Sequence, residues 1–292
     1  MNSRPPLTSL IRSALQEDSA HADITTRALI APHVRVRAQI IAKTPGVIAG
    51  AGIARQVFRA MDRRIRCTLK RRDGQRVRRG DVILALEGPA RTILAAERTA
   101  LNFLGHLSGI ATLTRAFVDR VRPYRVAILD TRKTLPGLRA LEKYAVRMGG
   151  GQSHRADLSE AVLIKTNHLR INCGLRNADC GMVIQDAIAT AKQLQPRKRV
   201  EIEVTNLTEL RAAFHARPHV ILLDNWTLSG IRKAVLLKNS TLRTPNSALP
   251  LEVSGGVTLR NVRALAATGV ERISIGRLTH SAPALDVSLQ VQ

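Results

Sequence analysis

Short apolar runs alternate with amphipathic stretches along most of the chain beyond residue 115. Runs that are apolar or alternate between apolar and polar residues predict strands over residues 126–129, 161–164, 200–204, 220–223, 251–253 and 273–275. Apolar residues at spacings of three and four predict helices over residues 182–194, 207–216, 228–237 and 259–267. Strands that alternate with helices predict a parallel sheet with crossover helices. We therefore expect an α/β barrel of parallel strands over residues 116–277.

The first 115 residues have a different pattern. A helix is predicted over residues 7–17, strands over 34–42 and 81–86, and a helical stretch over 91–107. Glycines at 46, 50 and 52 indicate turns between these elements. This order predicts an N-terminal α/β open sandwich, in which helices cover one side of a sheet, over residues 1–115. We expect the C-terminal tail, residues 278–292, to join that domain.

The chain is strongly basic, with a net charge of +24 and a pI near 11.5, which raises the possibility of nucleic-acid binding. The densest basic run, residues 59–79, has Ile65, Cys67 and Leu69 at alternate positions and a turn signal at Asp73-Gly74. This pattern is typical of a solvated β-hairpin. Because aromatic residues make up only 2% of the chain, few side chains could stack on bases. Nucleic acid is therefore not the primary ligand that we expect.

Composition also bounds the kind of protein. A hydrophobic content of 45% is typical of a globular chain. The sequence contains no apolar run long enough to predict a membrane span. The first 19 residues lack the apolar centre of a signal peptide, so we expect a cytoplasmic protein. Cys67, Cys173 and Cys180 are odd in number and match no zinc spacing, so neither disulfides nor a structural metal is predicted.

Positively charged side chains gather where two predicted strands end. Asp130-Thr131-Arg132-Lys133 follows the first strand of the predicted barrel, and Lys165-Thr166-Asn167-His168 follows the second. Ser153-His154-Arg155 lies between them, after a glycine triplet. Parallel strands present their carboxyl ends at one edge, where α/β folds hold ligands. Arg132, Lys133, His154, Arg155 and Lys165 therefore predict a site for an anion.

A helix is predicted between these two strands. Pro136 suits its first turn, and Gly149-Gly150-Gly151 ends it. We expect an apolar face and, opposite it, a solvated basic face. The apolar face consists of Leu138, Leu141, Ala145 and Met148, and the basic face of Arg139, Lys143 and Arg147.

Acidic residues occupy two further predicted strands. Glu201 and Glu203 are two apart, so both side chains point to the same face of their strand. Glu201 is open to either interpretation: a structural ion pair with a neighbouring base or a role in the site. Glu203 lies nearer the strand end, and Asp224 ends another strand, so these two are the catalytic candidates. They could stabilise a developing positive charge or hold Mg²⁺.

Glycines near the chain end predict a phosphate site. Ser254-Gly255-Gly256 follows one predicted strand, and Ser274-Ile275-Gly276 lies at the next. Glycine lets a phosphate approach the backbone, and free amides at the start of a helix donate to it. Two such segments at successive strand ends predict a phosphate cradle like that of many barrels.

Taken together, these segments resemble quinolinate phosphoribosyltransferase. The resemblance covers nearly the whole chain and rests on the ordered set DTRKTLPGLRALEKYAVRMGGG, SHR, LIKTNH, VEIEV, LLDN, LEVSGG and SIGRLTHSAPALDVSL. It implies that quinolinate and phosphoribosyl pyrophosphate give nicotinate mononucleotide, pyrophosphate and CO₂ in de novo NAD biosynthesis. It also implies Mg²⁺ beside phosphoribosyl pyrophosphate, and a homodimer in which Arg98 of the segment ERTALN reaches the neighbouring subunit's barrel.

The resemblance also implies roles for the candidate residues. Lys133, Glu203 and Asp224 are expected to be catalytic, with Glu203 and Asp224 as the Mg²⁺ candidates. Quinolinate is expected to contact Arg98, Arg132, His154, Arg155 and Lys165. Lys133 is expected to contact phosphoribosyl pyrophosphate, a role that Lys165 could share. The other expected substrate-binding residues are Thr131, Glu203, Asp224, Ser254, Gly255, Gly256, Ser274 and Gly276.

The chain departs from the family pattern at two positions, and related groups remain as alternatives. Ser153 stands where the family usually has Asn, and Thr166 stands where it usually has Asp. A related group associated with molybdenum transport typically lacks the lysine at Lys165, so its presence favours the quinolinate enzyme. Nicotinate phosphoribosyltransferase is a more distant alternative that would not decarboxylate. The non-enzyme alternative is a basic scaffold or nucleic-acid binder, whose binding would weaken steeply with salt.

Overall fold

The computed structural model describes residues 7–176, 180–241 and 249–292, which fall into two compact units. Unit 1 contains Met1–Arg115, Thr134–Gly150 and Arg277–Gln292, and unit 2 contains Ala116–Lys133 and Gly151–Gly276. Residues Thr134–Gly150, expected within residues 116–277, thus belong to unit 1.

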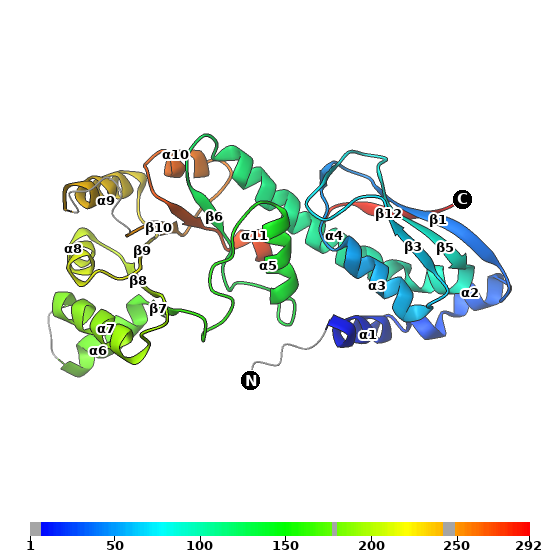
Figure 1. Cartoon of the computed structure of the whole chain (residues 1–292), viewed down its shortest axis with the longest axis horizontal. Coiled ribbons are helices and arrows are strands. Elements are labelled where there is room, and N and C mark those ends of the chain that lie inside the picture. The colour runs from blue at the N-terminus through cyan, green and yellow to red at the C-terminus, as the bar shows by residue number, and fades with distance from the viewer. Residues whose placement is uncertain (1–6, 177–179, 242–248) are drawn as a thin grey trace. The chain divides into compact units, whose positions relative to one another are not determined.

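Unit 2 is built on a parallel six-stranded sheet (Figure 1). Its strands are β6 (Ala127–Leu129), β7 (Val162–Ile164), β8 (Val200–Val204), β9 (Val220–Asp224), β10 (Leu251–Ser254) and β11 (Arg272–Ser274). They are ordered β6-β11-β10-β9-β8-β7, so β6 and β7 are the outer strands. Gln152 extends the array through a parallel bridge to Leu129 of β6. The expected α/β fold with parallel strands is confirmed in this part of the chain.

Helices follow the strands of unit 2 and lie along the outer side of the sheet (Figure 1). They are α6 (Thr166–Arg176), α7 (Cys180–Leu194), α8 (Leu207–Ala216), α9 (Leu228–Thr241) and α10 (Val262–Ala266). The expected helix over 259–267 was too long, because Thr258 and Asn261 form a turn ahead of α10. The amide of Thr258 donates to Oδ1 of Asn261 at 2.8 Å, and Nδ2 of Asn261 donates to the Gly256 carbonyl at 3.0 Å.

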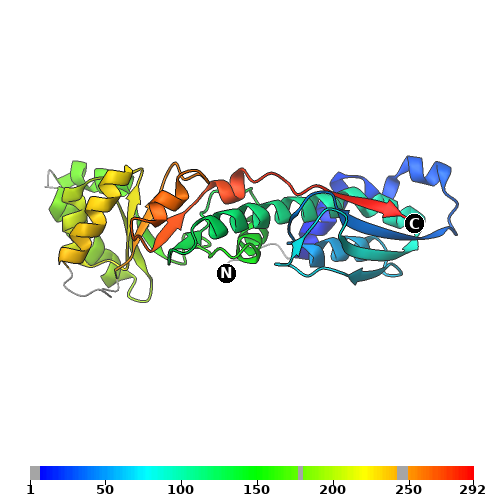
Figure 2. The same ribbon diagram turned by 90° about the horizontal axis from the view of Figure 1, so that it is seen from above.

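Unit 1 contains a four-stranded antiparallel sheet in the order β12-β1-β5-β3. The strands are β1 (Arg35–Ala42), β3 (Arg66–Leu69), β5 (Val82–Pro89) and β12 (Val287–Val291). Figure 2 shows the C-terminal strand β12 beside β1. A separate pair joins β2 (Gly46–Val47) to β4 (Arg76–Val77). The prediction of a hairpin within residues 59–79 was therefore wrong, because β3 pairs with β5 and β4 pairs with β2.

The helices of unit 1 include α4 (Ala90–Arg120), which is longer than expected and whose residues after Arg115 belong to unit 2. They are α1 (Leu7–Glu17), α2 (Ile24–Leu29), α3 (Ala51–Met61), α4 (Ala90–Arg120), α5 (Arg139–Met148) and α11 (Arg277–His280), with a short 3-10 turn, η1 (Ala20–Ala22). α1 contacts α3, which in turn contacts β3 and β5. α4 continues to Arg120, well beyond the helical stretch predicted over residues 91–107. None of the described helices is long and apolar enough to cross a membrane.

The buried face of α5 differs from the predicted one. Pro136 lies in the turn before the helix instead of in its first turn. The residues that face inward are Glu142, Lys143, Ala145 and Val146. Glu142 is buried because His106 Nε2 lies 2.9 Å from Oε1 and the Leu135 amide donates to Oε2 at 3.3 Å. The expectation of a solvated Lys143 was wrong, since only 3% of this residue is exposed.

Candidate active site

Two arginines form the cationic part of the site in unit 2. Arg132 follows β6, and Arg155 lies in the segment between Gln152 and β7. Burial and the neighbouring positive charge of Arg132 lower the pKa of Arg155. Nη1 of Arg155 donates to the Ala161 carbonyl at 2.9 Å, which holds the guanidinium near the start of β7. Two guanidinium groups within electrostatic range suit a ligand that has more than one carboxylate, because each can bind one carboxylate through two hydrogen bonds.

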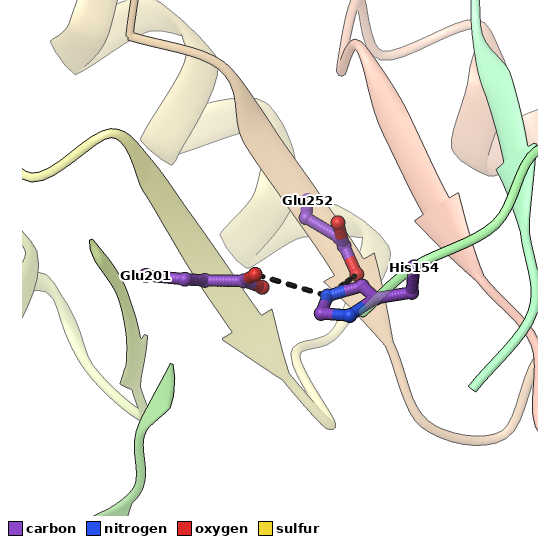
Figure 3. A group of neighbouring side chains, drawn as sticks. All are labelled: His154, Glu201 and Glu252. Atoms are coloured by element: carbon purple, nitrogen blue, oxygen red, sulfur yellow. Dashed lines mark ion pairs between the residues drawn. The ribbon is translucent and has the colours of Figure 1, made fainter. Parts of the chain in front are cut away.

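His154 is held on both sides of its ring (Figure 3). Its Nε2 lies 2.9 Å from Oε2 of Glu201 on β8 and 3.5 Å from Oε1 of Glu252 on β10. Its Nδ1 accepts a hydrogen bond from the Arg155 amide at 2.8 Å, and its own amide donates to Asp130 at 2.9 Å. We expected His154 to contact an anionic substrate, but the groups that face its ring are carboxylates.

The charge state of this cluster follows from burial and from its acids. Burial lowers the pKa of His154, but the hydrogen bond and charge of Glu201, together with Glu252, outweigh it and raise the pKa overall. Burial, and then the charge of Glu201, raise the pKa of Glu252, whose Oε2 accepts from Arg272 Nε at 2.6 Å. In its neutral form the ring accepts from the Arg155 amide at Nδ1 and therefore has its proton on Nε2.

In that tautomer Nε2 bears a proton and offers no lone pair to a metal ion. His154, Glu201 and Glu252 offer ligand atoms within 4.8 Å of one another, a spacing that a cation could bridge. Ligation through Nε2 would require the ring proton to move to Nδ1. The Arg155 amide occupies that position as a donor. The cluster is therefore a hydrogen-bonded network behind the arginines.

Glu252 and Arg272 were not singled out from the sequence. Glu252 is fully buried between Leu251 and Val253, in the same alternating pattern as the acids of β8. An acid at an inward position of an otherwise apolar strand is the signal that could have identified it. Arg272 lies opposite Glu252 in the parallel register of β10 and β11.

Glu203 lies at the carboxyl end of β8 beside the start of α6. Its Oε1 accepts from the Thr166 hydroxyl at 2.6 Å and from the Thr166 amide at 3.3 Å. Its Oε2 lies 3.7 Å from Nζ of Lys165. A carboxylate at the amino end of a helix is also favoured by the helix dipole. The sequence identified Glu203 and Lys165, but gave no role to Thr166 in holding the acid.

Asp224 shows that several charges converge at this end of the sheet. Burial, and then the negative charge of Glu203, raise the pKa of Asp224. The positive charges of Lys165 and Lys133 and a hydrogen bond from Asn225 act in the opposite direction. Two acids and two lysines, from the ends of β6, β7, β8 and β9, therefore lie within electrostatic range of one another.

The two glycines of the loop after β10 differ in the space around them. Gly255 has φ +92°, and a Cβ there would lie 2.0 Å from Oδ1 of Asn225. Gly256 has φ +60°, but a Cβ there would meet no atom within 4 Å. The expected helix start was wrong at this loop, because α10 begins only at Val262. Its exposed backbone, with no side chain on either glycine, remains open to a ligand.

The remaining candidates have different environments. Oγ1 of Thr131 accepts from the Lys133 amide at 3.1 Å, which shapes the turn after β6. Ser254 ends β10, Ser274 ends β11 with 4% exposure, and Gly276 directly precedes α11. Arg98 is exposed on α4 and belongs to unit 1, whereas the other candidates belong to unit 2. Cys67 is half-buried, and the side chains of Cys173 and Cys180 lie outside the described residues.

Comparison with known proteins agrees with this arrangement. The family model for the quinolinate phosphoribosyl transferase C-terminal domain matches residues 110–290, and that for the N-terminal domain matches residues 23–108. The chain belongs to the quinolinate phosphoribosyltransferase family.

Relatives of the quinolinate phosphoribosyltransferase family match almost end to end. The chain is 41% identical over 286 residues to the nicotinate-nucleotide pyrophosphorylase (carboxylating) of Mycobacterium leprae, covering 96% of this chain and 95% of that protein. It is 37% identical over 285 residues to the probable nicotinate-nucleotide pyrophosphorylase (carboxylating) of Bacillus subtilis, covering 98% and 93%. The solved structure of nicotinate-nucleotide pyrophosphorylase from Francisella tularensis is 40% identical, with a TM-score of 0.88 and coverage of 98% and 96%.

Proposed function

We propose that this chain is a quinolinate phosphoribosyltransferase of NAD biosynthesis. It would transfer the phosphoribosyl group of phosphoribosyl pyrophosphate to quinolinate, with release of pyrophosphate and CO₂. The observation that supports this best is the proximity of two charge groups in one unit. The positive charge of Arg132 lowers the pKa of Arg155, and Glu203, Asp224, Lys165 and Lys133 lie at the ends of neighbouring strands.

The arginine pair and the cluster of acids and lysines have different tasks in the proposed reaction. The adjacent arginines bind the vicinal carboxylates of quinolinate and direct its ring nitrogen toward C1′ of the ribose. As the bond to pyrophosphate breaks, positive charge develops on the ribose ring. Glu203 and Asp224 stabilise that charge, while Lys133 and Lys165 neutralise the departing phosphates. The exposed backbone at Gly255 and Gly256 receives the phosphate of the ribose.

Decarboxylation follows from the product of this transfer. Once the ring nitrogen bears the ribose, its positive charge stabilises the electron pair that stays on the neighbouring ring carbon when the carbon–carboxylate bond breaks. That bond breaks, CO₂ leaves, and the ring carbon takes a proton to give nicotinate mononucleotide.

The acids at the strand ends also suit Mg²⁺ that arrives with the phosphates. Oxygen ligands are the donors that this ion prefers, and it usually combines one or two carboxylates with substrate phosphates. Burial, and then the negative charge of Glu203, raise the pKa of Asp224, and a divalent cation would offset both effects. We propose Glu203 and Asp224 as the residues that would hold it. The ion would neutralise the charge of the pyrophosphate.

We further propose a homodimer in which Arg98 completes the neighbouring subunit's site. Arg98 is exposed on α4, so its guanidinium is accessible to a partner. Such an arrangement would place a third cation beside Arg132 and Arg155. The added positive charge would help to neutralise the two carboxylates of quinolinate and the phosphates of the second substrate. The cytoplasmic location expected from the sequence stays a prediction.

One assay tests the proposed reaction. Purified protein with Mg²⁺ is incubated with quinolinate labelled at the carboxylate next to the ring nitrogen, with and without phosphoribosyl pyrophosphate. Labelled CO₂ is expected only in its presence, together with nicotinate mononucleotide. Turnover of nicotinate without turnover of quinolinate would show that the assignment is wrong.

A further inference from the structure

Thr166 makes a short hydrogen bond to the catalytic candidate Glu203. Its hydroxyl donates to Oε1 at 2.6 Å, and its amide donates to the same oxygen at 3.3 Å. Thr166 begins α6 directly after β7, and Glu203 lies near the end of the paired strand β8. The two residues thus meet at the edge of the sheet where the proposed reaction takes place.

This is not the usual role of threonine at a helix start. A capping threonine accepts a hydrogen bond from a backbone amide within the first turn of its helix. Here the hydroxyl proton is directed away from α6 and toward a carboxylate on another strand. A donor to an ionised acid forms a stronger bond than a donor to a neutral group. The contact therefore acts on Glu203 more than on the helix.

The contact also decides which oxygen of Glu203 faces the other charges. The terminal torsion of a glutamate has a broad preference, so a carboxylate without fixed partners rotates. With Oε1 held by Thr166, Oε2 is the oxygen that lies 3.7 Å from Nζ of Lys165. Glu203 is only 8% exposed, so few water molecules could hold it in place of the hydroxyl.

We propose that Thr166 is a positioning residue, whose hydroxyl fixes the carboxylate of Glu203 so that Oε2 faces the reacting ribose. The inference rests on the proposed function for its catalytic meaning. Stabilisation of a developing charge depends on groups that are oriented before the reaction begins. Thr166 itself does not touch the reacting atoms.

Three variants test this proposal. Thr166→Val removes the hydroxyl with little change in shape, and Thr166→Ser keeps it. Thr205→Val is the matched control, because Oγ1 of Thr205 donates at 3.0 Å to the carboxylate of Glu209 at the exposed start of α8. The measurements are kcat, the KM for quinolinate, the melting temperature and a crystal structure of each variant.

Thr166→Val is expected to lower kcat about 10- to 100-fold, the range that corresponds to one hydrogen bond to a charged group. The KM for quinolinate should change less than about twofold, because the arginines that bind it are untouched. Thr166→Ser should keep most of the activity, and Thr205→Val should match the wild type. In crystals of Thr166→Val, the Glu203 carboxylate should rotate or adopt more than one orientation.

The crystal structures separate failure of this inference from failure of the proposed function. If the wild type does not convert quinolinate, the function is wrong, and the orientation of Glu203 still decides whether Thr166 positions it. An unchanged Glu203 carboxylate in Thr166→Val overturns the positioning role. A loss of kcat that Thr166→Ser shares in full also overturns it, because the hydroxyl would then not be the cause.

Discussion

Nε2 of His154 lies 2.9 Å from Oε2 of Glu201, and this contact links the buried acids of the sheet to the arginine site. Glu201 holds one side of the imidazole ring, and the amide of Arg155 occupies the other. The ring therefore ties the backbone that bears Arg155 to β8. We infer that His154 acts by positioning Arg155, and that the acids set its protonation.

Glu201→Gln tests the electrostatic part of this inference. Glu201 raises the pKa of His154 through its hydrogen bond and its charge, so the variant should lower that pKa. A folded-state pKa raised above the unfolded value of about 6.5 contributes stability that is present below about pH 6.5 and is lost as pH rises through the folded-state pKa. The free energy of unfolding of the wild type should thus exceed that of the variant by the largest amount at acidic pH. NMR titration of the His154 ring and urea unfolding across the pH series measure both effects.

The matched control is Glu209→Gln, which removes an acid from the start of α8 that contacts Thr205 and not His154. It should leave the His154 titration unchanged. An unchanged titration in Glu201→Gln would show that burial, and not Glu201, controls the ring.

Arg132→Lys tests whether the cation is needed as a planar fork. A lysine keeps the charge but cannot bind a carboxylate through two parallel hydrogen bonds. We expect kcat/KM to fall by roughly ten- to a thousandfold, as for a loss of about 1.4 to 4 kcal/mol of binding. Arg211→Lys, on the exposed face of α8, is the control and should behave as the wild type. Near-normal kinetics for Arg132→Lys would mean that Arg132 only balances charge.

Gly255→Ala and Gly256→Ala form a matched pair within the phosphate loop. Both positions have positive φ, which strains any other residue, but only Gly255 also lacks room, since its Cβ would lie 2.0 Å from Asn225. Gly255→Ala should lower the free energy of unfolding by about 2 kcal/mol or more, and Gly256→Ala by about 1 kcal/mol. Urea unfolding of the two variants checks the order. Equal losses would show that the loop moves away from Asn225 without strain.

Strand positions and strand-end charges could be predicted from the sequence because both have local causes. The run VEIEV gave β8 over Val200–Val204, and its alternation placed Glu201 and Glu203 on one face. The basic run at residues 59–79 was less predictable. Its alternation indicated strands, but the choice of β5 and β2 as partners depends on contacts distant in sequence.

The interior polar groups were harder to predict, because their burial depends on partners from other elements. Lys143 sits at a position that looks solvated on α5, yet it is buried. Glu252 has no local signal beyond one acid in an apolar strand, and its partners His154 and Arg272 come from two other segments. Thr166 was noted as a departure from the family pattern, but its contact with Glu203 appears only once β7 and β8 are paired.

Mixed dimers test whether Arg98 acts across a subunit interface. Arg98→Ala and Lys133→Ala chains, each inactive alone, are dissociated reversibly and mixed. In each mixed dimer, the barrel with intact Lys133 receives an intact Arg98, while the other site carries both defects. Random reassociation makes about half of the dimers mixed, so on the order of a quarter of all sites should recover activity. Recovery should appear only when subunits exchange, which mass spectrometry of isotope-labelled chains can establish independently. If exchange is complete and activity stays at the level of the separate variants, Arg98 acts within its own chain or has no role in the site.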